Sequence, residues 1–323
     1  MWQKLKNYYH LLKSALAAIY FGFPSQKLDV IGVTGTDGKT TTSSMLNKIL
    51  KDSGFKVSVI TSVNAQIGKQ TYETGFHVTT PSPWQVQRFL RKAVNAQSKY
   101  FILETTSHRL DQNIVANINF AVGVVTNITH EHLDYHKTFK KYAEAKAKLL
   151  SKSNISVING DDASFELLKS RAKDKIVTYA LSDWADVNPN NFKLKLKVSG
   201  IYNVYNALAA AAAAQALGIG KRQITYSLNH FLGIRGRMEE VETKQSFRAI
   251  VDFAHTPNAI EQALATLKDS QAKGARLIAV FGSAGNRDRT KRPKMGEAAA
   301  KYADVCVLTA EDPRTEKVEK ICT

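Results

Sequence analysis

A glycine-rich loop near the start of the chain joins a short apolar segment to an amphipathic one. Leu28 to Val33 has strand character, residues 34–42 read T-G-T-D-G-K-T-T-T, and the apolar side chains of residues 45–50 then recur at helical spacing. In such a strand, loop and helix, glycines allow backbone amides to surround phosphate oxygens at the positive end of the helix. Lys39 would reach the β- and γ-phosphates, and the Thr40 hydroxyl would bind Mg²⁺. The segment therefore predicts a nucleotide-binding α/β domain.

The loop departs from a strict Walker A sequence at one position. That pattern requires glycine at position 33, where this chain has Val33, with Gly32 and Gly35 on either side. An ordinary glycine turn is the alternative interpretation. Such a turn does not need a lysine and a threonine at the start of a helix, so nucleotide binding is favoured.

Short apolar runs recur along the whole chain, and most are separated by helical patterns. We expect strands at Leu28 to Val33, Val57 to Ile60, Tyr100 to Leu103, Ala121 to Val125, Ile155 to Ile158, Ala249 to Val251, Leu277 to Phe281 and Val305 to Leu308. This alternation predicts parallel sheets covered by helices, with ligands bound beyond the carboxyl ends of the strands. Polar residues follow most of these runs directly, as that rule requires.

The chain of 323 residues exceeds the usual size of one domain. We expect an N-terminal amphipathic helical segment at residues 1–27 and a P-loop NTPase-like central domain with a mainly parallel sheet at residues 28–232. A partial Rossmann-like α/β domain is expected at residues 233–323. A helix from Met1 to Phe23 that packs on the central domain is favoured over a membrane-surface anchor, although its spacing allows both.

Composition limits the compartment and the partners. Cys306 and Cys322 form neither a disulfide framework nor a zinc pattern, and no apolar run approaches the length of a membrane span. We therefore expect a cytoplasmic protein, and we expect it to be a monomer. The formal charge of +17 indicates anionic partners, for which ATP, UDP-sugars, nucleic acid and acidic membranes all qualify.

Two groups of side chains suggest chemistry beyond the loop. Glu104 directly follows an apolar run, a place from which an acidic residue commonly completes a magnesium site. On the helix expected after Thr138, Lys146 lies on the same stripe as Tyr142 and Leu149. Burial would favour its uncharged, nucleophilic amine. An ion pair, or an amine that extends to solvent, is the alternative.

The motifs taken together resemble those of the Mur ligases. Their order is T-G-T-D-G-K-T-T-T at residues 34–42, T-T-P at 79–81, E-T-T-S-H at 104–108, T-N-I-T-H-E-H-L-D-Y-H at 126–136, A-K-A-K-L at 145–149, N-V-Y-N at 203–206, G-R-M-E at 236–239, D-F-A-H-T-P at 252–257, G-N-R-D with K-R-P at 285–293, and E-D-P-R at 311–314. The resemblance is strongest to the branch that adds the third amino acid to a UDP-N-acetylmuramoyl-dipeptide. It implies an ATP-dependent ligase that works through an acyl phosphate.

The resemblance also implies residue roles. ATP would be bound by Gly35, Thr36, Asp37, Gly38, Lys39, Thr40, Thr41, Asn127, Asn206, Arg237 and Asp252, with Asn206 at the adenine. Mg²⁺ would be bound by Thr40 and Glu104, and a second Mg²⁺ by His132 and a carbamylated Lys146. Lys39, His132 and Lys146 would be catalytic. Thr79, Thr80 and Ser107 would contact the muramoyl-peptide, and Arg314 the incoming amino acid, for which a diacid such as diaminopimelate is favoured over lysine.

The chain also departs from the family pattern. The family has a uridine-binding domain before the loop strand, where 27 residues stand here, and we expect the C-terminal domain to be incomplete. The sequence E-D-P-R replaces the family's D-N-P-R. A folylpolyglutamate synthetase is the alternative among enzymes, but its loop resembles T-G-T-N-G-K-G-S, whereas this chain has threonine at positions 40–42. A basic nucleic-acid-binding ATPase is a third hypothesis, but no RNA-binding or recognition-helix motif supports it, so we expect no nucleic-acid partner. A non-catalytic nucleotide-binding fragment is the fourth.

Overall fold

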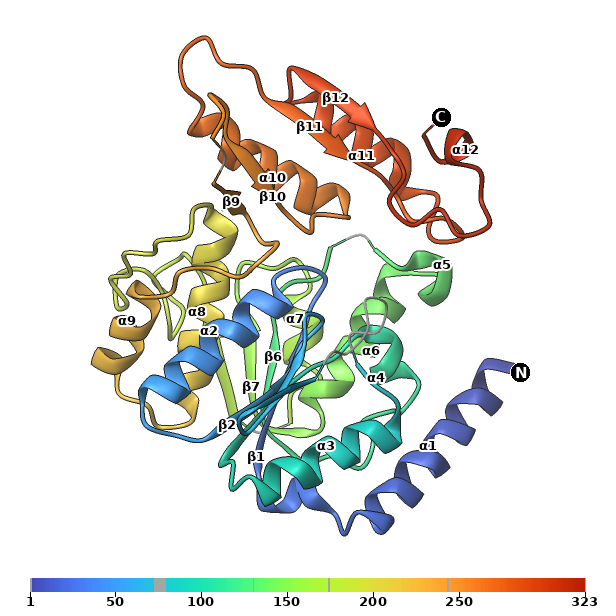
Figure 1. Ribbon diagram of the computed structural model, residues 1–323. Helices are drawn as coiled ribbons and strands as arrows, with labels where there is room; N and C mark the ends of the chain where they lie inside the picture. The colour runs from blue at the N-terminus through green and yellow to red at the C-terminus, as the bar shows by residue number, and fades with distance from the viewer. Residues whose placement is uncertain (1, 73–79, 130, 174, 243, 323) are drawn as a thin grey trace. The chain divides into compact units, whose positions relative to one another are not determined.

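The computed structural model describes residues 2–72, 80–129, 131–173, 175–242 and 244–322 (Figure 1). The chain divides into two compact units. The first contains Met1–Ile128, Lys140–Lys197 and Asn203–Phe231, and the second contains Thr129–Phe139, Val198–Tyr202 and Leu232–Thr323. Within the described ranges, none of the helices has the length and apolar character needed to cross a bilayer.

The first unit is built on a sheet whose strands follow the order β4-β3-β2-β5-β1-β6-β7-β8. Six strands are parallel: β1 (Asp29–Thr34), β2 (Val57–Ile60), β5 (Tyr100–Glu104), β6 (Phe120–Val125), β7 (Ser153–Asn159) and β8 (Lys175–Tyr179). β3 (Ala65–Ile67) and β4 (Gln70–Tyr72) form an antiparallel hairpin at one edge. Val33 pairs with Glu104, and Thr34 pairs with Val125. The carboxyl ends of β5, β1 and β6 therefore lie side by side.

Helices cover both faces of this sheet. Figure 1 shows α2 (Lys39–Asp52), α8 (Ile201–Ala216) and α9 (Lys221–Asn229) on one side of the strands, and α3 (Pro83–Asn95), α4 (Ser107–Asp111) and α6 (Phe139–Leu150) on the other. One core cluster joins Phe101 and Leu103 of the sheet to Val86 and Leu90 of α3. In α8, every side chain from Ala207 to Ala214 is fully buried.

The N-terminal helix α1 (Trp2–Tyr20) packs on α3, and the 3₁₀ turn η1 (Pro24–Lys27) follows it. Ser14 Oγ donates to the carbonyl of Ile114 at 3.3 Å, and Arg91 Nε donates to the carbonyl of Phe21 at 2.9 Å. The helix expected at the start of the chain is therefore present and attached to the first unit.

The second unit contains a parallel strand pair joined through a helix. β11 (Ile278–Phe281) leads through α11 (Lys291–Ala300) to β12 (Val305–Leu308), and α10 (Pro257–Asp269) precedes them. Ile260 and Leu264 of α10 pack with Ala279 and Met295 in one core cluster. The other elements are the antiparallel pair β9 (Glu239–Val241) and β10 (Ala249–Val251), together with α5 (Leu133–His136) and α12 (Val318–Cys322). The first unit also contains α7 (Phe165–Lys169).

The predicted α/β class is confirmed, and each of the eight predicted strands is present with ends that differ by at most two residues. Sequence reasoning missed β3, β4, β8 and β9. β3, β4 and β9 have three residues each, too few for a periodic pattern, and β8 begins with an exposed lysine at an edge of the sheet. Their pairing depends on neighbours that are distant in sequence.

Glu316 connects several donors in the second unit. Arg292 Nη2 donates to the Glu316 carboxylate at 2.8 Å, and the backbone amide of Asn286 donates to Glu316 Oε2 at 3.0 Å. Arg289 Nη2 forms an ion pair with Glu316 Oε1 at 3.1 Å. These contacts lower the pKa of Glu316 to about 2, and the hydrogen bond from Arg292 has the largest effect. Because the folded-state pKa lies below the usual 4.5, the carboxylate stabilises the fold above pH 4.5, and the effect is lost as the pH falls toward 2.

Glu316→Gln should therefore lower the thermal unfolding midpoint at pH 7, and the difference from the parent should shrink as the pH falls from 4.5 to 2. Glutamine resembles the protonated side chain, so both proteins lack the charge in acid. The midpoint at several pH values measures this effect. Glu297→Gln, an exposed position on α11, is the matched control. A difference that does not change with pH would show that the charge of Glu316 is not what stabilises the unit.

Candidate active site

The loop between β1 and α2 is held in shape by residues that follow the neighbouring strand β6. Thr126 Oγ1 donates to the carbonyl of Asp37 at 2.6 Å, and the backbone amide of Asp37 donates to Asn127 Oδ1 at 2.9 Å. The amide of Thr36 also donates to the carbonyl of Asn127 at 2.8 Å. In the structure, therefore, Asn127 contacts the backbone of the loop and fixes its path.

Two glycines in the loop stand where a side chain would collide with a neighbour. A Cβ at Gly35 would lie 1.7 Å from Thr126 Oγ1, and one at Gly38 would lie 2.1 Å from Asn206 Oδ1. Gly38 also has a φ of +80° and is the residue before α2. The loop therefore requires glycine at these positions, both for its close approaches and for its left-handed turn.

Two lysine amines converge on the backbone of this loop. Lys39 Nζ donates to the carbonyls of Thr36 at 2.8 Å and Gly35 at 3.1 Å. Lys146 Nζ, on a side chain that is only 1% exposed, donates to the same Gly35 carbonyl at 2.6 Å and lies 4.6 Å from the centre of the Tyr142 ring. The predicted inward direction of Lys146 is confirmed. Both amines thus lie beside the N-terminus of α2, where anions are stabilised.

Oxygen atoms gather on the other side of the first turn of α2. Thr40 Oγ1 lies 3.1 Å from Glu104 Oε2 and 2.8 Å from Ser62 Oγ, and the amide of Ser62 donates to Glu104 Oε2 at 3.0 Å. Glu104 is 1% exposed. Hydroxyl and carboxylate oxygens are the ligands that Mg²⁺ prefers, and it ordinarily adds waters and substrate phosphates to one or two carboxylates. This donor set fits a magnesium ion.

Two of the predicted substrate contacts lie beside Glu104. Thr80 Oγ1 donates to the Glu104 carbonyl at 3.1 Å and accepts the backbone amide of Thr106 at 3.3 Å. Ser107, which begins α4, is 1% exposed. Thr79 lies outside the described residues. Thr80 and Ser107 therefore stand at the carboxyl end of β5, next to the Thr40 and Glu104 oxygens.

Asn206 of α8 is placed against the loop from another direction. Its side chain is 5% exposed, accepts a hydrogen bond from Thr42 Oγ1 at 3.4 Å and donates to Asn203 Oδ1 at 3.3 Å. Its amide oxygen also limits the space at Gly38. The predicted nucleotide-binding residues of the first unit are thus brought together around a single loop.

The other predicted site residues belong to the second unit. Asp252 accepts the backbone amides of Met238 at 2.7 Å and Ala254 at 2.8 Å, and the Arg237 guanidinium lies 4.5 Å from the centre of the Phe253 ring. Asp252 therefore shapes the turn that bears Arg237.

His132 and Arg314 are also in this unit, and each has left-handed backbone, with φ of 56° and 52°. His132 Nδ1 lies 3.8 Å from Glu131 Oε1, and Arg314 Nε donates to Asp312 Oδ2 at 3.2 Å. Such a backbone is uncommon outside glycine and often occurs at functional sites.

Sequence reasoning missed Ser62, Tyr142 and the pair of Lys291 with Glu131. Ser62 lies just beyond the carboxyl end of β2, and Glu104 is the last residue of β5, so the rule of carboxyl strand ends could have found Ser62. The helical spacing of Tyr142 predicts only that it shares the stripe of Lys146, whereas its hydroxyl lies 3.0 Å from Thr36 Oγ1. Lys291 Nζ lies 3.3 Å from Glu131 Oε1 and donates to the His255 carbonyl at 2.7 Å, a contact distant in sequence with no local signal.

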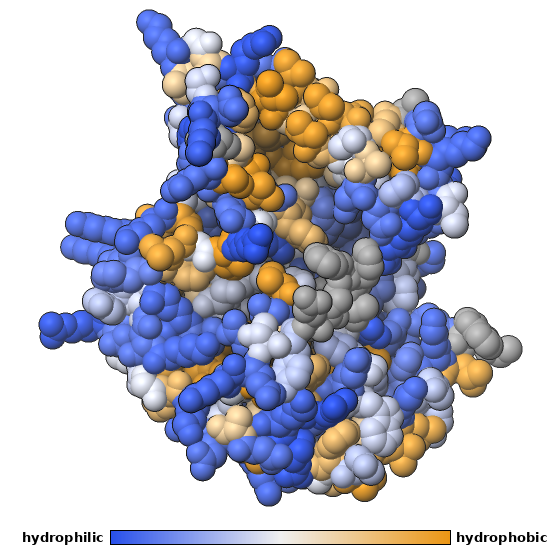
Figure 2. Space-filling model, in the orientation of Figure 1, coloured by the Kyte–Doolittle hydropathy of each residue, from blue (hydrophilic) through white to orange (hydrophobic). Residues whose placement is uncertain are grey.

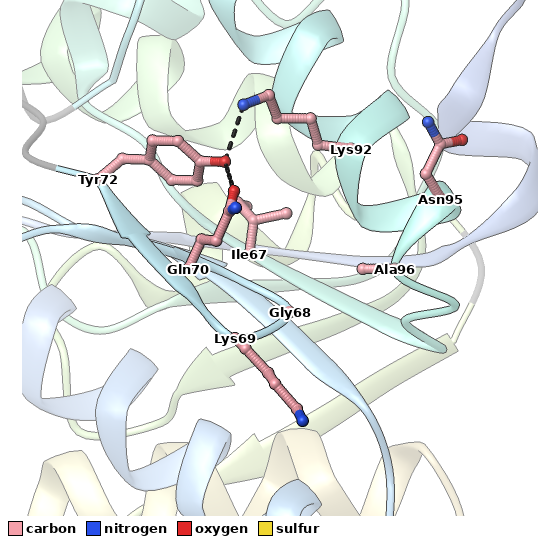
Figure 3. A pocket seen from close by; sticks show the side chains of 8 residues that line it. All are labelled: Ile67, Gly68, Lys69, Gln70, Tyr72, Lys92, Asn95 and Ala96. Atoms are coloured by element: carbon pink, nitrogen blue, oxygen red, sulfur yellow. Dashed lines mark hydrogen bonds between the residues drawn. The ribbon is translucent and has the colours of Figure 1, made fainter.

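A separate hollow lies at the β3–β4 edge of the sheet, away from the loop. It is lined by Ile67, Gly68, Lys69, Gln70, Tyr72, Lys92, Asn95 and Ala96. Figure 3 shows Lys92 of α3 and Gln70 of β4 both directed at the Tyr72 hydroxyl, with Lys92 Nζ at 2.8 Å. These polar groups satisfy one another, and the hollow is no part of the candidate active site.

Comparison with known proteins decides the family. The model of the Mur ligase middle domain matches residues 33–214, and that of the Mur ligase glutamate ligase domain matches residues 236–323. This chain belongs to the Mur ligase family. Members of the family are ATP-dependent ligases that form amide bonds.

A UDP-N-acetylmuramoyl-L-alanyl-D-glutamate–2,6-diaminopimelate ligase of Caldanaerobacter subterraneus subsp. tengcongensis is 37% identical over 325 residues, covering 95% of this chain and 66% of that protein. A solved structure of a UDP-N-acetylmuramoyl-L-alanyl-D-glutamate–2,6-diaminopimelate ligase aligns with a TM-score of 0.66 and 32% identity, over 91% of this chain and 64% of the other.

The chain thus spans about two thirds of the length of these Mur ligases. E. coli FolC, solved in complex with DHPP and ADP, aligns with a TM-score of 0.74 over 96% of this chain and 81% of that one. At 21% identity, this likeness shows a shared fold.

Proposed function

We propose that this chain binds ATP and Mg²⁺ and joins the peptide carboxylate of a UDP-N-acetylmuramoyl-dipeptide to diaminopimelate or lysine. The observation that carries the proposal is the convergence of the Lys39 and Lys146 amines on the Gly35 carbonyl, beside the oxygen cluster of Thr40 and Glu104. In one place, this arrangement offers the Lys39 cation and helix amides for phosphates, and hard oxygen ligands for a metal. The proposed substrates are taken from the names of the similar diaminopimelate ligases.

In this proposal, the amine of Lys39 and the amides of the loop neutralise the γ-phosphate as it passes from ATP to the peptide carboxylate, giving an acyl phosphate and releasing ADP. The amine of the incoming amino acid then attacks the acyl carbon, and phosphate leaves as the amide forms. Thr40 and Glu104 would hold a magnesium ion, which supplies charge neutralisation at the phosphates. The protein's own contribution is mainly positioning and electrostatics.

The remaining roles follow from the family motifs. We assign Asn206 to the adenine, and Arg237 and Asp252 to the nucleotide. Thr80 and Ser107, with Thr79, would contact the muramoyl-peptide, and Arg314 a carboxylate of the incoming amino acid. His132 and a carbamylated Lys146 would hold the second magnesium ion. Lys146 is the most informative of these, because its buried amine donates to the loop in its unmodified form.

The test is phosphate release from ATP in the presence of UDP-N-acetylmuramoyl-L-alanyl-D-glutamate, with diaminopimelate, lysine or neither added, and with Lys39→Ala as the blank. Release that requires both the nucleotide-linked peptide and one amino acid would establish the ligase and identify that amino acid. ATP binding without release would reject the proposed substrates. Dihydrofolate with glutamate is then the next pair to supply.

The Gly38 turn predicts a specific loss of nucleotide affinity. Gly38→Ala should weaken ATP binding by at least about tenfold, or about 1.4 kcal/mol, because its Cβ would displace the Asn206 amide. Titration calorimetry measures this directly. Gly54→Ala is the matched control, since Gly54 has a φ of +86° and none of the described atoms lies within 4 Å of its Cβ position. Both variants bear the same strain of roughly 1 kcal/mol, and equal losses in both would refute the argument.

A further inference from the structure

The N-terminal helix α1 turns its large apolar side chains outward. The exposed fractions are 64% for Leu5, 61% for Tyr8, 55% for Tyr9, 50% for Leu12, 60% for Leu16, 61% for Ile19 and 74% for Tyr20. These positions recur three or four residues apart, so they form one continuous stripe along the helix, called here the outer stripe. In the orientation of Figure 1, Figure 2 shows hydrophobic atoms recurring along the edge where α1 lies.

The inner face of α1 consists of small and polar side chains. Ser14, Ala17 and Ala18 are fully buried there, and Asn7 Nδ2 donates to Asp111 Oδ2 at 3.4 Å. A surface helix ordinarily turns its apolar face to the core and its polar face to water. In α1 the arrangement is reversed. The domain attaches α1 without using the outer stripe, and a contiguous apolar surface of this kind marks an interaction site.

The charged side chains of α1 itself have a single sign. The first acidic residue of the chain is Asp29, so α1 has only lysines and one histidine among its ionisable groups, tyrosines aside. Lys13 Nζ lies beside the stripe, 3.1 Å from the Tyr9 hydroxyl. The pKa of His10 is lowered, mostly because the side chain is partly buried. The nearby charges of Arg109, Lys13 and Lys6 lower this pKa further. Cations on α1 itself and on α4 therefore lie near His10.

Aromatic rings gather at the end of the helix. The ring centres of Tyr20 and Phe21 lie 5.3 Å and 5.9 Å from that of Trp84 on α3. Tyrosine and tryptophan combine an apolar ring with a polar group, which suits them to the boundary between lipid tails and water. The helix therefore combines an apolar stripe, flanking cations and interfacial aromatic residues, which together characterise a helix lying in a membrane interface.

We propose that α1 binds the surface of an anionic lipid bilayer, with the outer stripe in the headgroup region and its lysines on lipid phosphates. A second copy of the chain is the competing occupant. Two copies would repel each other, because each has a formal net charge of +17. The α1 of a second copy also has no carboxylate to pair with these lysines. Anionic headgroups supply that charge, and they attract basic segments next to a membrane. The helix lies on the surface without spanning the bilayer.

The experiment is co-sedimentation of the full chain with vesicles of phosphatidylcholine, alone or mixed with phosphatidylglycerol. We expect binding to the mixed vesicles to be at least about tenfold stronger than to phosphatidylcholine alone, and to weaken as salt is raised. Leu12→Glu combined with Leu16→Glu should reduce binding to the mixed vesicles by at least about tenfold. The matched control combines Ile201→Glu with Leu232→Glu, which places the same charges at exposed apolar positions, 51% and 80% exposed, outside α1.

Circular dichroism should show that both double variants keep the fold, because the four positions are exposed. Equal vesicle binding by the parent and the α1 variant, or no binding by the parent, would overturn the proposal. Sedimentation velocity without lipid tests whether a second copy of the chain covers the outer stripe. A parent dimer that the α1 variant loses would assign the outer stripe to a second copy instead. Lys6→Gln with Lys13→Gln should reduce the preference for phosphatidylglycerol while leaving the weak binding to phosphatidylcholine.

Discussion

Replacing Lys146 with alanine is expected to reduce ATP-dependent phosphate release by a factor on the order of 10³, the size of effect seen when a preorganised electrostatic group is removed. The side chain is buried, and its amine contacts the backbone of the loop between β1 and α2. No other described lysine side chain is so fully buried. The measurement is phosphate release under the conditions proposed above for the ligase. Lys140→Ala, an exposed position on the same helix, should keep full activity.

Chemical rescue then distinguishes two roles for Lys146. If the carbamylated form is the active one, formate or acetate should restore part of the activity of Lys146→Ala, because each replaces the lost carboxylate. If the unmodified amine is the active form, short alkyl amines should rescue instead, because the structure shows that amine donating to the Gly35 carbonyl. Undiminished turnover in Lys146→Ala would remove both roles.

Glu104→Gln should produce the second large loss, on the order of 10² in turnover, together with at least a tenfold rise in the Mg²⁺ concentration needed for half-maximal rate. The substitution keeps the shape of the side chain and removes its charge. Glutamine can still accept a hydrogen bond from Thr40, so the fold should persist. A magnesium titration of the initial rate measures both quantities.

Two further variants calibrate that result. Ser62→Ala should raise the magnesium requirement by less than Glu104→Gln, because it removes a neutral oxygen from the same cluster. Glu166→Gln, an exposed position on α7, should leave the titration unchanged. If Glu104→Gln shares the magnesium midpoint of the parent, Glu104 does not bind the metal.

The parts of the site that could be predicted from sequence are those with short-range determinants. The loop between β1 and α2 depends on consecutive residues, and the burial of Lys146 follows from the helical spacing that it shares with Tyr142 and Leu149. Strands with central apolar runs were predicted for the same reason.

What could not be predicted depends on contacts between distant residues. The two hydrogen bonds by which Asn127 holds the Asp37 backbone appear only when β6 lies beside β1. The direction of the outer stripe was equally hidden, because an amphipathic sequence does not show which face meets the domain. The small and polar inner face of α1 is recognised only from the structure, in which Ser14 Oγ donates to the Ile114 carbonyl.

The buried alanines of α8 bear on how this protein tolerates change. An alanine side chain has no rotatable torsion, so burying it costs no rotamer entropy. The helix is located instead by the close fit of its backbone to its surroundings, since interiors are packed too densely to accept an added methylene without displacement. Asn206 precedes the first of these alanines, and its amide oxygen stands against Gly38. A larger side chain on this face of α8 should therefore displace the helix, and with it the Asn206 amide that stands against Gly38.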